Sequence, residues 1–303
     1  MNAKKIDLME NGKMKHQEGF FKGVRNISIY FQSWLPENEP KAILLIVHGL
    51  AEHSGRYMNI VNRFVSLGYG VYGIDHLGHG KSDGKRVHVE RFEDYTNTLK
   101  VYLDMIRRWQ PGKPIFLVGH SMGGLIGAVY LIEHQTELTG AVLSGAAVKV
   151  PKNITPAILV VGKMLSALAP RFGLIGLEAD GVCRDPAVVK AYISDPLVYK
   201  GKATARLAAE ILKAMQYVSA QATKITLPIL MVQGSADRLV DPAGSQMLYE
   251  AVSSDDKEIR IYDGFYHEVF NEPEHDEVLR DVEIWLEAHL GSCKSTPLER
   301  AGL

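Results

Sequence analysis

One serine stands between glycines in the decapeptide VGHSMGGLIG, residues 118–127, directly after a short apolar run. This is the G-x-S-x-G pattern of a nucleophile elbow, in which a strand turns sharply into a helix and exposes a serine hydroxyl. Gly119 and Gly123 would leave room for the backbone to double back, and Ser121 would take a strained conformation. The helix that starts there has a dipole that favours developing negative charge. Because short patterns recur by chance, a glycine-rich turn with an idle serine is the alternative.

A serine nucleophile needs a base that takes its proton and an acid that orients the base. In folds with such an elbow, the expected order along the chain is serine, acid, histidine. Asp237 comes just after the apolar run 229–232, and His267 comes just after the run 259–262. Because both follow expected strand ends, as the elbow does, the sequence predicts a triad of Ser121, Asp237 and His267.

Two other aspartates compete for the position of the acid. Asp241 precedes Pro242, which is typical of the N-cap of a following helix. Asp263 precedes Gly264, which is typical of a turn. We therefore favour Asp237 as the acid.

Acyl transfer also needs hydrogen-bond donors for the oxyanion of a tetrahedral intermediate. The loop after the apolar run 42–47 begins with His48-Gly49, and the backbone N–H of Leu50 is expected to be one donor. The backbone N–H of Met122, the residue after the nucleophile, is expected to be the other. We interpret His48 as a structural histidine that bonds the loop backbone rather than as a catalytic residue.

The stretches that must position these residues alternate between short apolar runs and longer helical patterns. Strands buried on both faces are continuously apolar, and the alternation predicts an α/β fold with a mostly parallel sheet flanked by helices. The expected strands are 27–34, 42–47, 70–74, 115–118, 141–143, 229–232 and 259–262. The expected helices are 57–67, 92–109, 122–134, 242–252 and 276–290.

One interval interrupts this alternation. Between residues 143 and 229 there is no clear strand, and helical patterns at 154–169 and 204–219 are separated by turn signals such as Asp185-Pro186. We interpret 149–223 as an inserted helical cap over the carboxyl ends of the strands, where open α/β sheets bind ligands. Such a cap would control entry to the site.

The rest of the chain divides around this cap. Residues 1–148 and 224–290 are expected to form the α/β core, and the polar segment 291–303 is expected to be a flexible tail. With 303 residues and 46% hydrophobic content, the chain can fill a sizeable core. The formal net charge of -1 leaves no basic stripe for nucleic acid, and the two cysteines match no metal-ligand spacing.

The N-terminal stretch has lysines but lacks the apolar region of a secretory signal, and the chain has no apolar run long enough to span a bilayer. These features favour a cytoplasmic protein. The sequence leaves its oligomeric state open.

The expected cap helix at 154–169 is apolar nearly all round, with Thr155, Lys163 and Ser166 as its only polar side chains. A surface helix normally has a broad polar face. We expect the inner side of this helix to line an acyl tunnel and its outer side to make transient contact with membranes or micelles. A cap packed into a small core of its own, or against a dimer partner, is the alternative.

Five motifs follow one another in order along the chain. They are HGLAEHSGRY at 48–57, DHLGHGKSDG at 75–84, GHSMGG at 119–124, SDPL at 194–197 and GSADRLVDP at 234–242. Together they resemble the monoglyceride lipase family of the α/β-hydrolase superfamily, and the likeness runs from about Phe20 to Leu290. The resemblance implies a serine hydrolase whose lipid ester substrate is a monoacylglycerol, with lysophospholipases and general carboxylesterases as close relatives.

The resemblance implies the same triad and the same oxyanion donors as above. It further implies that four residues line the polar end of the substrate pocket: Glu52, Arg56, His120 and Tyr192. An ion pair between Arg56 and Glu52 that fixes the loop is an equally good structural interpretation. Ala51 stands where relatives often have glycine, so the loop is strained if this position needs a positive φ.

These features together predict an ester hydrolase that works through an acyl-enzyme. His267 would take the Ser121 proton as the hydroxyl attacks the ester carbonyl, and would then protonate the leaving glycerol before water releases the fatty acid. This chemistry needs no metal or organic cofactor. The alternatives are a lysophospholipase or general carboxylesterase with the same triad, acyl transfer or peptide hydrolysis, and a hydrolase-like protein that only binds a ligand.

Overall fold

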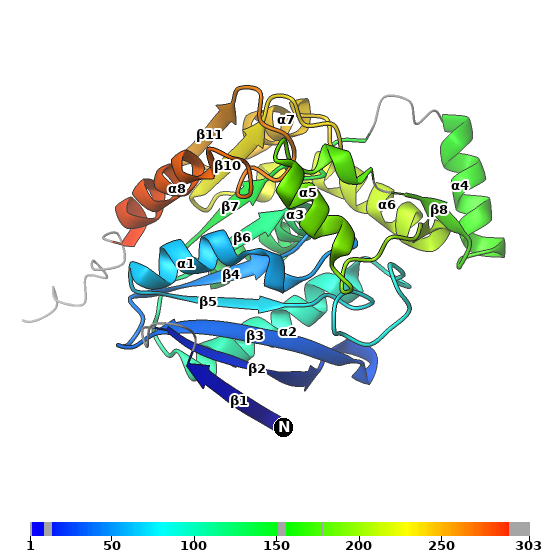
Figure 1. Cartoon of the computed structure of the whole chain (residues 1–303). Helices are drawn as coiled ribbons and strands as arrows, with labels where there is room; N and C mark the ends of the chain where they lie inside the picture. Colours follow the sequence, from blue (N-terminus) through cyan, green and yellow to red (C-terminus); the bar gives the residue numbers. More distant parts are fainter. Residues whose placement is uncertain (1, 9–13, 151–155, 177, 291–303) are drawn as a thin grey trace, which may run out of the picture.

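One large sheet runs through the protein, as the computed structural model shows (Figure 1). The structure describes residues 2–8, 14–150, 156–176 and 178–290. In these residues, strands pair in the order β1-β2-β3-β5-β4-β6-β7-β10-β11. The strands are β1 (Asn2–Leu8), β2 (Met14–Lys22), β3 (Ser28–Pro36), β4 (Ala42–Val47), β5 (Tyr69–Ile74), β6 (Ile115–His120), β7 (Gly140–Ser144), β10 (Ile229–Gly234) and β11 (Lys257–Tyr262).

The larger part of this sheet is parallel. Neighbouring strands from β5 through β4, β6, β7 and β10 to β11 run in the same direction. The pairs β1–β2, β2–β3 and β3–β5 are antiparallel. The mostly parallel α/β fold predicted from the apolar runs is thereby confirmed.

Two hydrophobic cores cover the faces of the sheet because side chains alternate along each strand. In β4, the side chains of Ile43, Leu45 and Val47 pack into the core that contains α2 and α3. Leu44 and Ile46 pack into the core that contains α1 and α8. The helices around the sheet are α1 (Met58–Ser66), α2 (Glu93–Trp109), α3 (Met122–His134), α7 (Ala243–Ala251) and α8 (His275–Leu290).

Several elements were not expected from the sequence. β1 and β2 extend the sheet at its antiparallel edge, where β2 buries only part of its side chains and lacks a continuous apolar run. The sequence shows no clear strand between residues 143 and 229, but two short ones are present there, where β8 (Gly173–Ile175) pairs with β9 (Ala203–Thr204). The Asp185-Pro186 turn signal is instead the start of α5 (Pro186–Ser194), which the Asp185 side chain caps. Strands of two or three residues are too short to show a period in sequence.

The interval between β7 and β10 also contains α4 (Pro156–Leu168) and α6 (Ala205–Gln221). Figure 1 shows α4, β8 and α6 on the side toward which the arrowheads of β4 and β5 point. α6 packs on α3 of the core, and α4 packs on α6. We call the described residues 156–176 and 178–223 the cap segment. The expected helix start at Ile154 and the expected tail 291–303 lie outside the described residues.

No helix in the described ranges combines the length and apolar character needed to cross a bilayer.

The turn from β6 into α3 brings two backbones into direct contact. A methyl group on Gly123 would overlap the carbonyl oxygen of Val47, at the end of β4. A methyl group on Gly119 would lie 2.6 Å from the carbonyl oxygen of Gly123. The first turn of α3 therefore packs against β4 with no room for a side chain between them.

We expect Gly123→Ala to lower the free energy of unfolding by at least about 1–3 kcal/mol, because the added methyl meets backbone that cannot move aside. Thermal unfolding should show a fall in Tm of several degrees. Gly162→Ala in α4 is the matched control, since a methyl there meets nothing within 4 Å, and it should keep or raise Tm. Equal Tm values for wild type and Gly123→Ala would contradict this account of the turn.

Candidate active site

Ser121 occupies the sharp turn between β6 and α3. Its φ of 57° and ψ of -120° lie in a region that residues other than glycine rarely adopt. The conformation is held by three backbone hydrogen bonds: Ser121 N–H donates to the Ser144 carbonyl, and the N–H groups of Leu125 and Ala147 donate to the Ser121 carbonyl. The elbow geometry expected from the G-x-S-x-G pattern is therefore present, with the serine at the N-terminus of α3.

Asp237 and His267 come together from the loops that follow β10 and β11. His267 Nδ1 lies 2.7 Å from Asp237 Oδ2. The other carboxylate oxygen accepts hydrogen bonds from the backbone N–H groups of Leu239 and Val240. Burial alone would raise the pKa of Asp237, but the hydrogen bond and charge of His267 and the two N–H donors leave that pKa below its usual value. An ionised Asp237 holds Nδ1 of the ring, so Nε2 is the nitrogen left to act as a base.

The competing aspartates have other partners. Asp241 accepts a hydrogen bond from the backbone N–H of Ala243, the first residue of α7, and forms an ion pair of 2.7 Å with Lys149. Asp263 accepts a hydrogen bond from the hydroxyl of Ser235 at 3.0 Å. The carboxylate that contacts His267 is that of Asp237.

A cavity of about 530 Å³ brings these groups to one place. Ser121, Asp237 and His267 line it, together with Leu50 and Met122, whose N–H groups are the expected oxyanion donors. The cap segment and the neighbouring core loops add apolar walls from Ile175, Val182, Ile211, Met215, Leu239 and Val240. The cavity thus lies between the ends of the parallel strands and the cap segment.

The loop of residues 48–52 carries the expected oxyanion donor Leu50, and we call it the oxyanion loop. It passes directly beside Ser121. A Cβ atom on Gly49 would lie 3.2 Å from Ser121 Cβ and 2.8 Å from Glu52 Oε1, so a side chain here would have to displace Glu52. The Gly49 N–H donates to Glu52 Oε1 at 2.6 Å. In the described part of the chain, the N–H groups of Leu50 and Met122 donate to no acceptor.

Ala51 has a φ of 65°, which is the left-handed conformation. The strain expected at this position, where relatives often have glycine, is therefore present. Its carbonyl oxygen accepts a hydrogen bond of 2.8 Å from the backbone N–H of Tyr199 in the cap segment. The oxyanion loop is therefore strained at a residue that also anchors the cap segment.

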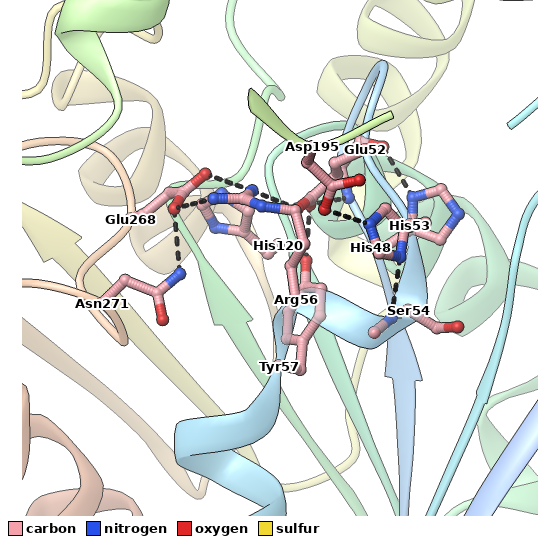
Figure 2. Close-up of polar contacts among 12 residues, drawn as sticks. His48, Glu52, His53, Ser54, Arg56, Tyr57, His120, Asp195, Glu268 and Asn271 are labelled. Carbon is pink, nitrogen blue, oxygen red and sulfur yellow. Dashed lines mark hydrogen bonds and ion pairs between the residues drawn. The ribbon is translucent and has the colours of Figure 1, made fainter. Parts of the chain in front are cut away.

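A buried charge cluster lies beside the oxyanion loop (Figure 2). The guanidinium of Arg56 donates to Glu52 Oε2 at 2.7 Å and forms a two-point contact with Glu268 at 2.6 and 2.8 Å. Tyr57 donates its hydroxyl to Glu52 Oε1, and Arg56 stacks 4.6 Å from the centre of the Tyr192 ring. Burial alone would raise the pKa of Glu52, but Arg56 and neighbouring histidines lower it to about 2. Arg56 therefore ties the oxyanion loop to the residue after His267.

Glu268 was not expected as a site residue. It directly follows His267 in sequence and lines the same cavity. Its partner Arg56 lies 212 positions away along the chain, so no local pattern reveals the pair. The only available signal was an acidic residue next to the expected base.

Three of the four expected pocket residues line the cavity: Glu52, His120 and Tyr192. Arg56 lies behind them, in contact with Glu52 and Tyr192. The His120 ring centre lies 4.6 Å from that of His267. Burial and the proximity of His267 lower the pKa of His120 to about 4, so His120 is neutral at pH 7.

Comparisons with known proteins agree on one family. The family model described as serine aminopeptidase S33 matches residues 38–274. The chain is 40% identical to a monoacylglycerol lipase of Mycolicibacterium smegmatis, covering 90% of this chain and 98% of that protein. It is 33% identical to the monoglyceride lipase of Homo sapiens, covering 85% and 86% of the two chains. The crystal structure of Paleococcus ferrophilus monoacylglycerol lipase matches with a TM-score of 0.77 and 32% identity, covering 86% and 99%.

We expect Ala51→Gly to stabilise the protein. A left-handed conformation costs an L-residue about 1–2 kcal/mol, and the greater freedom of glycine in the unfolded chain offsets only about 0.5–1 kcal/mol. Tm should rise by about 1–3 °C. Ala220→Gly, on the exposed face of α6, is the control and should lower Tm. A similar fall in both variants would show that residue 51 is unstrained.

Proposed function

The chain belongs to the serine aminopeptidase S33 family of α/β-hydrolases, and from this premise we propose that it cleaves monoacylglycerols with a triad of Ser121, His267 and Asp237. The protein is a serine hydrolase. The observation that carries the proposal is the shared cavity, in which a strained serine, a histidine held by a carboxylate and two unused N–H groups meet. Its similarity to proteins named monoacylglycerol and monoglyceride lipases supports the choice of substrate.

The reaction follows from the roles of these groups. His267 Nε2 takes the proton of Ser121 as the hydroxyl attacks the ester carbonyl, and Asp237 stabilises the imidazolium that forms. The N–H groups of Leu50 and Met122 bind the oxyanion of the tetrahedral intermediate. His267 then gives its proton to the departing glycerol oxygen, and a water molecule releases the fatty acid by the same steps in reverse. Because His267 handles every proton, these steps call for no cofactor.

The cavity has a polar side and an apolar side, which suits an amphiphilic ester. The polar side consists of Glu52, His120, Tyr192 and Glu268, which offer carboxylates, an imidazole and a phenol to glycerol hydroxyls. The apolar side includes Ile175, Ile211 and Met215 of the cap segment and Leu239 of the core. We infer that glycerol lies against the charge cluster and the acyl chain against the cap segment.

We propose that the cap segment also contacts lipid aggregates. α4 exposes four large apolar side chains: Val160 at 58%, Val161 at 62%, Met164 at 58% and Leu168 at 81%. Phe172, soon after α4, is 57% exposed. A contiguous exposed apolar patch is typical of an interaction site, whereas scattered single residues are not. An apolar surface on the same cap segment that lines the cavity through Ile175, Ile211 and Met215 suits a substrate that resides in membranes or micelles.

Ser121→Ala should lower kcat on monoacylglycerols by a factor on the order of 10⁴ or more, because the acyl-enzyme cannot form. Circular dichroism should show an unchanged fold. We would measure kcat/KM for 1-monoacylglycerols of increasing chain length beside matched p-nitrophenyl esters and lysophosphatidylcholine. Wild type should prefer the glycerol esters. Retained turnover in Ser121→Ala would contradict the triad, whereas a preference for short p-nitrophenyl esters would contradict only the substrate.

Met164→Glu with Leu168→Glu should weaken binding to phosphatidylcholine vesicles about tenfold or more, since burial of one large apolar side chain is worth about 1.5–3 kcal/mol. Hydrolysis of vesicle-borne monoacylglycerol should fall with binding, and hydrolysis of a soluble p-nitrophenyl ester should not change. Ile284→Glu on α8, where Ile284 is 60% exposed, is the control and should affect neither. Equal losses on both substrates would mean that these side chains serve the fold rather than lipid contact.

A further inference from the structure

His48 is fully buried at the start of the oxyanion loop, and both of its ring nitrogens contact backbone. Nδ1 lies 2.8 Å from the carbonyl oxygen of Gly49. Nε2 lies 2.8 Å from the backbone nitrogen of His76, which follows β5. The imidazole thus bridges the oxyanion loop and a neighbouring loop of the core (Figure 2 shows its place beside Glu52).

The hydrogen bonds define the tautomer of His48. A backbone N–H can only donate, so the His76 N–H donates to Nε2, and Nε2 carries no hydrogen. Burial lowers the pKa of His48, against the charges of Glu52 and Asp75, and keeps the ring neutral. A neutral imidazole has one N–H, which is therefore at Nδ1 and donates to the Gly49 carbonyl.

The Gly49 carbonyl belongs to the same peptide unit as the Leu50 N–H. This peptide is planar and trans, so its C=O and N–H point in opposite directions. When the His48 ring holds the oxygen, the N–H must point the other way, and Leu50 lines the cavity that contains Ser121. We propose that His48 is a positioning residue that aims the Leu50 N–H at the oxyanion. This proposal rests on the proposed function, in which that N–H binds the oxyanion.

The loop needs such a restraint because of its own sequence. Gly49 has no side chain to limit rotation of its backbone. Ala51 follows in a strained conformation with a φ of 65°, and a flip of the preceding backbone is one way to relieve strain. Glu52 already holds the peptide before Gly49 through the Gly49 N–H. His48 holds the peptide after it, so both sides of the flexible glycine are fixed by buried side chains.

The neighbouring histidines do not share this role. The ring centres of His76 and His79 lie 4.2 and 5.4 Å from that of His48. Within the described residues, both ring nitrogens of His76 and Nε2 of His79 have no hydrogen-bond partner. Nδ1 of His79 contacts the carbonyl of Leu77, outside the oxyanion loop. His48 is thus the member of this group that restrains the oxyanion peptide.

Three substitutions at His48 separate an effect on the orientation of the Leu50 N–H from an effect on the stability of the fold. His48→Asn keeps an amide N–H near the place of Nδ1 and loses the acceptor for the His76 N–H. His48→Gln places its amide near Nε2, where it can accept from His76, and loses the donor to Gly49. His48→Leu loses both. His79→Leu removes a neighbouring buried imidazole without touching the oxyanion peptide and serves as the control.

We would measure kcat, KM and Tm of each variant on a soluble p-nitrophenyl ester. His48→Gln and His48→Leu should lower kcat about 10- to 100-fold, somewhat less than complete removal of an oxyanion donor, and should leave KM within about threefold of wild type. His48→Asn should keep kcat within about fivefold of wild type even though its Tm falls. His79→Leu should lower Tm and leave kcat unchanged.

A purely structural His48 would make kcat follow Tm across the series, and that result would overturn the proposal. Wild-type kcat in His48→Gln would overturn it as well. If His48→Leu does not fold, the contrast between the Asn and Gln variants decides alone. Ser121→Ala, assayed in parallel, distinguishes failure of the proposed function from failure of the inference about His48. Activity in Ser121→Ala overturns the proposed triad. An inactive Ser121→Ala beside His48 variants with wild-type kcat overturns only the inference about His48.

Discussion

The close approach of α3 to the end of β4 is the constraint on which the site depends. Because Gly123 has no side chain, the helix can pack against the carbonyl groups of Val47 and His48. This contact places the start of the oxyanion loop beside Ser121. A Cβ atom on Gly49 would lie 3.2 Å from the Cβ atom of Ser121. Leu50 and Met122, from two distant parts of the chain, therefore line one cavity because two backbones touch, and no side-chain adjustment can substitute for that contact.

Around this contact, burial and ion pairing fix the charge states of several side chains. Glu52, with a pKa near 2, and Arg56 hold each other ionised. Burial keeps His120 neutral, with its pKa near 4. Asp237 is ionised and bonded to His267. Asp237 and the charge cluster therefore surround His267 with groups whose charge states are fixed by burial and by their partners.

The sequence predicted the parts of the site that local patterns encode. Ser121 lies in a strand-to-helix turn, and Asp237 and His267 follow apolar strands, so these positions followed from strand ends together with the expected order of serine, acid and histidine. Glu268 could not be predicted as a partner of Arg56, because the pair depends on how two distant loops pack. In the same way, the fold class followed from the apolar central strands, whereas β2 and α5 lack a long apolar period and were not recognised.

Two residues beside the cavity, Ser121 and Ala51, have strained backbone conformations. Ser121 and Ala51 both have positive φ values, of 57° and 65°. Neither conformation is favoured by its own residue type, so each must be held by the surroundings. Ser121 is held by hydrogen bonds to β7 and α3, and Ala51 by the bond from Tyr199 of the cap segment. The core therefore positions Ser121, whereas the loop that carries Leu50 is held partly by the cap segment.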